Sequence, residues 1–222
     1  MKVFIDVFQL FKRNMTATLR NPVFLFMGVF TPILYLTLFA PMLENFAQMK
    51  GFQGSNVLTT FIPGMLALIA FSGGLFAGFG IIDELRNGVL ERMRVTPCSR
   101  FALMAGPVFR DVIAVLAQIT VFILLAIPFG FKAHVGGLAL ALILLMMLVT
   151  TTSCFGNAMG LITKSEDHFA PVVHGINLPV ILLSGMMLPM AMAPKWLQIT
   201  AHFNPVYYVV EASRLLVSGN IL

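Results

Sequence analysis

The chain has 222 residues, of which 59% are hydrophobic and only 10% are charged, with a formal net charge of +5. A soluble domain carries charge on roughly a quarter of its residues, so lipid must surround much of this chain. The basic residues stand between apolar segments rather than in a stripe with aromatic residues, which excludes the usual pattern of a nucleic-acid-binding surface. We therefore expect an all-α membrane protein that has no nucleic acid partner.

Residues 1–20 are predicted to form an amphipathic helix that lies in the membrane interface. The apolar residues of its first half recur at helical spacing: Val3, Phe4, Val7, Phe8 and Phe11. The polar residues fall on the opposite side: Lys2, Asp6, Gln9, Lys12 and Arg13. Packing of the same helix on the rest of the protein is a second interpretation, and both can hold at once.

Five long apolar segments follow, and each is long enough to cross a bilayer as a helix. They cover residues 23–43, 58–82, 103–131, 135–162 and 169–190. Residues 191–218 differ, because Asn204-Pro205 interrupts them and charged residues are present. We predict short re-entrant helices on the outer membrane face there. The whole chain, residues 1–222, is then a single transmembrane domain.

The distribution of Lys and Arg predicts a cytosolic N-terminus, because positive residues accumulate on the cytosolic side of membrane proteins. With that orientation the cytosolic set is Lys2, Lys12, Arg13, Arg20, Arg86, Arg92, Arg94, Arg100, Arg110 and Lys164. The smaller outer set is Lys50, Lys132, Lys195 and Arg214.

Polar residues inside the predicted spans are candidates for a cargo pathway, although hydrogen bonds between helices explain them about as well. These candidates are Gln118, Asn157, His174 and Asn177. Arg110 and Asp111 open the third predicted span on its cytosolic side. We expect them to snorkel toward water or to pair with the charged loop described next.

The loop at residues 83–100 is the most charged part of the chain. A helix is predicted from Leu85 to Arg94, and Thr96-Pro97 would end it. Its apolar residues would form a ridge able to enter a groove on a partner: Leu85, Val89, Leu90 and Met93. Composition alone is equally compatible with a solvated loop.

Three motifs in this order resemble the type-two ATP-binding-cassette (ABC) transporter permeases. The first is Glu84-x-x-x-Gly88-x-x-Glu91-Arg92-Met93-x-x-Thr96-Pro97. The others are Arg20-Asn21-Pro22 before the first span and the segment at residues 204–214, which begins Asn-Pro-Val-Tyr-Tyr. The resemblance implies a permease of the bacterial drug, polysaccharide or lipid exporter type, in the inner (cytoplasmic) membrane. Members of the family generally have six spans, so a sixth would be missing after the five predicted here.

The resemblance further implies that the charged loop couples this chain to a separate ABC ATPase subunit. The residues carried over for this role are Glu84, Arg86, Gly88, Glu91, Arg92, Thr96 and Pro97. ATP and Mg²⁺ would be bound by that partner, since the G-x-x-x-x-G-K-[ST] motif is absent from this sequence. The chain would thus be a transport subunit without enzymatic activity or a cofactor of its own. It would be paired with a second permease in a homodimer or heterodimer, and surrounded by membrane lipid.

Two other classes of function fit the sequence less well than the exporter. An intramembrane metalloprotease would need His-Glu-x-x-His, and no histidine here is followed by glutamate. An ion-coupled secondary transporter or channel usually places acidic residues near the middle of a span. The sequence suggests none there, which favours the exporter over the carrier.

Overall fold

The computed structural model describes residues 2–20, 30, 33–34, 37–38, 57–94, 99–129, 131, 134–187, 190 and 193–218. Within these residues the chain is helical and has no β-strand, which confirms the all-α prediction. The helices are α1 (Lys2–Leu19), α3 (Val57–Leu75), α4 (Gly78–Arg86), α5 (Val89–Arg94), α6 (Arg100–Ala126), a 3₁₀ turn η1 (Ile127–Phe129), α7 (Val135–Thr163), α8 (Glu166–Ser184), α9 (Lys195–Ala201) and α10 (Pro205–Ser218). The first predicted span lies almost entirely outside the described residues.

Three segments of the described chain are long and apolar enough to cross a membrane: Phe61–Arg86, Phe101–Ala126 and Gly136–Thr163. They correspond to the second, third and fourth predicted spans. The fifth predicted span is shorter than expected, because α8 ends at Ser184 rather than near Met190. This helix also begins with Glu166 and Asp167, which lower its hydropathy.

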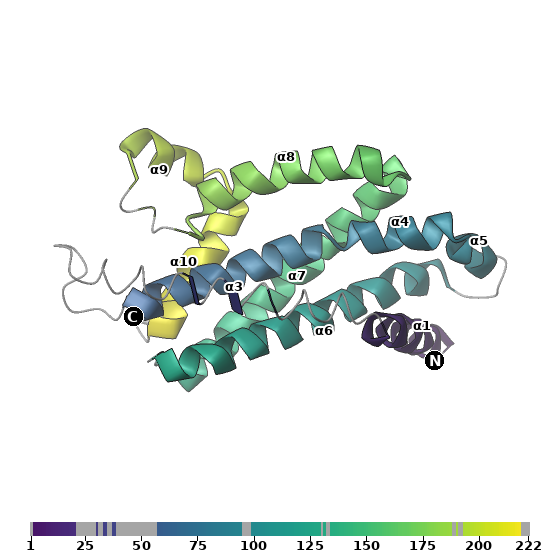
Figure 1. Cartoon of the computed structure of the whole chain (residues 1–222), viewed down its shortest axis with the longest axis horizontal. Coiled ribbons are helices and arrows are strands. Elements are labelled where there is room, and N and C mark those ends of the chain that lie inside the picture. The colour runs from purple at the N-terminus through teal and green to yellow at the C-terminus, as the bar shows by residue number, and fades with distance from the viewer. Residues whose placement is uncertain are drawn as a thin grey trace.

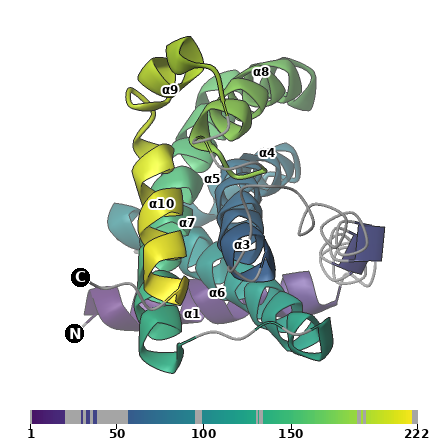
Figure 2. The same cartoon turned by 90° about the vertical axis from the view of Figure 1, so that its left-hand side faces the viewer.

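The long helices run side by side, and shorter helices lie across both ends of the bundle (Figure 1). One end carries α1, α5 and the beginning of α6, and the opposite end carries α9 and α10 (Figure 1). Seen along the bundle, α1 and α10 both lie roughly perpendicular to the long helices (Figure 2). The predicted helices at residues 1–20 and 191–218 are therefore present, and each lies across an end of the bundle.

Glycines bring α3 and α4 close to α7 along the centre of the bundle. A side chain on Gly74 would strike Thr152, and one on Gly78 would strike the backbone of Gly156 and the ring of Phe169. Small residues allow membrane helices to approach at this distance. The glycine run of the second span thus serves packing within one subunit.

We expect Gly78→Ala to destabilise the bundle by about 1–3 kcal/mol, because the added methyl group has no space between two helices. Gly175→Ala is the matched control, since a Cβ at Gly175 on α8 would meet nothing within 4 Å. Alanine also favours a helix over glycine by up to about 1 kcal/mol. Thermal unfolding in detergent should show a lower midpoint for the first variant and an equal or higher midpoint for the second. Equal midpoints for both variants would contradict this account of the packing.

The far end of the bundle exposes an apolar face. On α9 and the turn after it, Trp196 is 68% exposed, Ile199 64% and Phe203 84%. Asn204 ends this turn, where its Nδ2 donates to the Val180 carbonyl of α8 and its Oδ1 accepts from the Val206 amide. The break predicted at Asn204-Pro205 is thus held by side-chain hydrogen bonds to two helices.

Candidate functional site: the coupling segment

The charged segment after the second span, residues 83–94, is called the coupling segment below. It consists of the end of α4 and α5, two helices rather than one. α4 ends at Arg86, and α5 begins at Val89. Between them Gly88 has a φ of 65°, in the left-handed region that glycine adopts without a steric penalty. The prediction of one helix from Leu85 to Arg94 was therefore wrong, and Asn87-Gly88 is the turn signal that should have indicated the break.

An ion pair joins α1 to α4. Arg13 Nη2 donates to Glu84 Oε1 at 2.7 Å, and Arg13 Nη1 also contacts the Met93 sulfur of α5 at 3.1 Å. The Glu84 side chain is only 17% exposed, so this pair is better shielded from water than an ordinary surface pair. The N-terminal helix and the coupling segment are thereby fastened into one unit.

α1 also packs on α6. Leu10 and Asn14 are buried, and a Cβ on Gly106 of α6 would come within 2.8 Å of Leu10 Cβ. The opposite face of α1 leaves Phe4 and Phe8 exposed. Packing on protein and exposure of an apolar face therefore coexist, as the sequence allowed.

A second ion pair joins the coupling segment to α8. Arg86 Nη1 donates to Glu166 Oε1 at 3.0 Å, with side chains 67% and 46% exposed. Exposed ion pairs of this kind contribute at most about 1 kcal/mol to the stability of the fold. Arg86 and Glu84 are thus both engaged within the chain.

Glu91 and Arg92 face outward on α5 and are exposed. Arg92 donates to the carbonyls of Gly88 and Asn87, so it covers the end of α4. Within the described residues Glu91 has no ion-pair partner. Of the predicted coupling residues, Thr96 and Pro97 lie outside the described part of the chain.

The predicted apolar ridge is partly or fully buried within the chain. Leu90 is buried, while Leu85, Val89 and Met93 are half-buried. Among the described residues, this segment presents mainly polar side chains to its surroundings, and the contact of the ridge with a partner stays a prediction.

Among the described residues, Arg110 pairs with Asp111 rather than with the charged loop. Arg110 Nε and Nη2 both donate to Asp111 Oδ1, at 2.9 and 2.6 Å. Asp111 Oδ2 accepts from Ser153 Oγ of α7 at 2.6 Å, and Asn157 Nδ2 donates to the same hydroxyl at 3.2 Å. A buried polar network thus crosses from α6 to α7, with Asp111 ten residues beyond Phe101 in the apolar helix Phe101–Ala126.

The four candidate pathway residues do not converge. Asn157 is buried in the network just described, and Asn177 on α8 accepts from Ser72 Oγ of α3 at 3.3 Å. His174 stacks near Phe76, with ring centroids 5.2 Å apart. Of these four residues, Gln118 lines the cavity between α1, α3–α4 and α6.

Comparison with known proteins places these features in a family. The ABC-2 type transporter family model matches residues 6–217. The chain is 29% identical to a putative transport permease, ycf38, of Cyanophora paradoxa over 219 residues, covering 96% of this chain and 74% of that protein. It is 23% identical over 210 residues to the daunorubicin resistance ABC transporter permease protein DrrB1 of Streptomyces coeruleorubidus, covering 93% and 73%. The probable multidrug ABC transporter permease YbhR of Escherichia coli K12 is 22% identical over 154 residues, covering 69% and 42%.

Proposed function

Because this chain belongs to the ABC-2 type transporter family, as a multi-pass membrane permease subunit, we propose that it forms the transmembrane half of an ATP-driven exporter. Its cargo would be amphipathic: drug-like, lipid or glycan. The observation that carries this proposal is the coupling unit of α1, α4 and α5, which an ion pair of 2.7 Å fastens together at one end of the bundle.

The proposed mechanism passes motion from a separate ATPase to the spans. α5 stands at the end of the bundle, and its exposed Glu91 and Arg92 are available to a partner (Figure 1). α3 continues into α4 after only two residues, Phe76 and Ala77. Backbone hydrogen bonds of the i to i+3 type join these two residues to both helices: Ala77 donates to Gly74, Phe79 to Phe76 and Gly80 to Ala77. Displacement of α5 would therefore act on the second span directly, because packed helices shift as units.

The orientation belongs to the same proposal. The basic residues Lys12, Arg13, Arg86 and Arg92 lie at the end that carries the coupling unit, whereas Lys195 and Arg214 lie at the other. By the positive-inside rule, this distribution supports a cytosolic coupling unit and a cytosolic N-terminus. The likeness to bacterial permeases supports the inner membrane as the location of the protein. Two such permease chains and two ATPase subunits would form the complete transporter, in which ATP and Mg²⁺ are bound by the ATPases.

The test is co-purification from the native host in detergent, followed by identification of the bound subunits and an ATPase assay. We expect an ABC ATPase to co-purify and Glu91→Arg to weaken its binding about tenfold, since a charge facing a partner is reversed. The mass of the complex should correspond to two permeases and two ATPases. Asp167→Arg, an exposed reversal in the first turn of α8, is the control and should retain the ATPase.

Asp111 gives weight to one alternative, an ion-coupled transporter or channel, because a buried carboxylate within a span is a common feature of such proteins. Transport into vesicles distinguishes the two functions. Dependence on ATP supports the exporter. Dependence on an ion gradient without a requirement for ATP would contradict it.

A further inference from the structure

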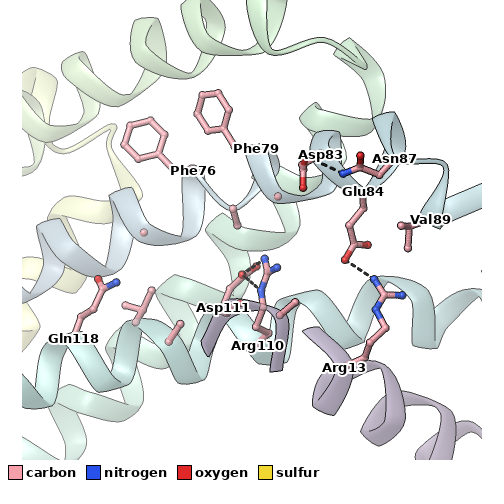
Figure 3. A pocket seen from close by; sticks show the side chains of 17 residues that line it. Arg13, Phe76, Phe79, Asp83, Glu84, Asn87, Val89, Arg110, Asp111 and Gln118 are labelled. Carbon is pink, nitrogen blue, oxygen red and sulfur yellow. Dashed lines mark hydrogen bonds and ion pairs between the residues drawn. The ribbon is translucent and has the colours of Figure 1, made fainter. Parts of the chain in front are cut away.

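A cavity of about 790 Å³ lies between α1, α3–α4 and α6. Its size falls within the range of small-molecule sites, roughly 300–1,000 Å³. Its apolar lining combines two phenylalanines, Phe76 and Phe79, with small or short residues: Gly73, Ala77, Gly80, Ala114 and Val115. Figure 3 shows polar side chains around it, with Arg13 and Glu84 toward α1, Gln118 at the opposite end, and Arg110 and Asp111 between them.

The side chain of Arg110 lies in the wall of this cavity, where hydrogen bonds fix its position. Two of its nitrogens donate to one oxygen of Asp111, whose other oxygen accepts from Ser153. The side chains of Arg110 and Asp111 are only 16% and 8% exposed. A guanidinium fixed in this way loses little conformational entropy when it binds a further group.

Arg110 retains donors that the protein does not use. A guanidinium has five N–H groups, and Nη1 has no acceptor among the described residues. Arg110 is nine residues beyond Phe101, the first residue of its span, or about 14 Å along the helix. Arg110 lines the cavity, and its Nη1 is not among the buried polar atoms that lack a partner, so this nitrogen is accessible to an acceptor from outside the chain.

The charges around the cavity indicate which acceptor fits. Arg110 is balanced by Asp111, and Arg13 by Glu84. Asp83 is left as an exposed carboxylate at the edge, where Asn87 donates to it. An additional anion would meet no uncompensated positive charge on the cavity wall. A cation would gain little from Asp83, because that carboxylate is exposed to water. An uncharged oxygen, in contrast, can accept the free N–H bonds.

We propose that this cavity binds an amphipathic molecule with an uncharged, hydroxyl- or carbonyl-bearing headgroup. The headgroup oxygens accept hydrogen bonds from Arg110, and the apolar part lies along Gly73, Ala77 and Val115 toward Gln118. The molecule is either exported cargo or a resident membrane lipid. The cargo version rests on the proposed function, whereas the binding site itself does not.

The experiment uses the full chain in nanodiscs and two fluorescent probes with the same apolar tail, pyrenedecanol and pyrenedecylamine. We expect the alcohol to bind about tenfold more tightly than the amine, which corresponds to one hydrogen bond from a charged donor. The double variant Arg110→Leu/Asp111→Asn should lose this preference, because it removes the donor without leaving a buried charge. Lys195→Leu, a basic residue at the far end, is the control.

A second variant distinguishes a loss of binding from a folding defect. Ala114→Phe fills the cavity from its wall and leaves the polar network intact, so it should abolish binding of the alcohol while unfolding at the same temperature as the wild type. Equal affinity for the two probes, or unchanged binding in both variants, would overturn the proposal.

Two further measurements separate the sources of the ligand. Stimulation of the co-purified ATPase by pyrenedecanol would identify the site as one for cargo. A hydroxyl-bearing lipid that co-purifies with the wild type and is lost from Ala114→Phe, without such stimulation, would identify it as a lipid site. Failure of any ATPase to co-purify would refute the proposed function, but the binding measurements would still test the cavity.

Discussion

Glu84→Arg is expected to reduce ATP-driven transport by about tenfold while the ATPase remains bound. Glu84 is largely buried and pairs with Arg13 at 2.7 Å, so the substitution places two guanidinium groups together and separates α1 from α4. Arg13 is 39% exposed, so solvent lowers the cost of breaking this pair below that of a fully buried one, to roughly 1–3 kcal/mol, or about one tenfold step. The measurement is transport per ATP hydrolysed in proteoliposomes.

The charge-swapped double variant Arg13→Glu/Glu84→Arg should recover much of this ratio, because an ion pair can form again in the same place. Arg86→Glu serves as the matched control. Its pair with Glu166 is exposed, and we expect less than about a twofold effect. A normal transport ratio in Glu84→Arg would show that α1 and α4 need not be fastened together for coupling.

Arg214→Ala is expected to destabilise the protein by about 3 kcal/mol. Arg214 is 7% exposed on α10, where it donates to the Gly185 carbonyl at the end of α8 and pairs with Glu211 at 2.9 Å. Gly64 of α3 leaves room for this guanidinium, since a Cβ there would come within 3.2 Å of it. Removal of the side chain deprives a buried carbonyl of its donor and opens a space between three helices.

Thermal unfolding in detergent measures this loss. The unfolding midpoint of Arg214→Lys should lie between those of the wild type and the alanine variant. A lysine ammonium group cannot reproduce the hydrogen-bond geometry of a planar guanidinium. Lys195→Ala, an exposed substitution at the same end, should change the stability by less than about 0.5 kcal/mol. An unfolding midpoint for Arg214→Ala equal to that of this control would refute the anchoring role.

The sequence predicted the elements whose signals are local. α6 and α7 follow from long apolar runs, and α1 follows from its helical periodicity. The break after Asn204 follows from Asn-Pro, and the break at Asn87-Gly88 could have been predicted from the same kind of signal. The motif that resembled a permease family identified the family correctly.

Contacts between distant residues were beyond the reach of these signals. Arg13 and Glu84 are separated by 71 positions, and Asp111 and Ser153 by 42. Periodicity gives each residue a face on its own helix but does not say which helix packs against that face. For this reason the hydrogen bond of Asp111 with Ser153 was not predicted, and Arg13 was absent from the predicted coupling residues.

Trp196 is the single tryptophan of the chain, and it lies on α9 at the opposite end of the bundle from α5. Because its indole ring is 68% exposed, its emission spectrum responds to changes in its surroundings. The protein therefore carries a built-in optical reporter at the end remote from its coupling unit. A spectral shift on addition of ATPase and nucleotide would show, without an added label, that a conformational change at α5 also changes the surroundings of α9.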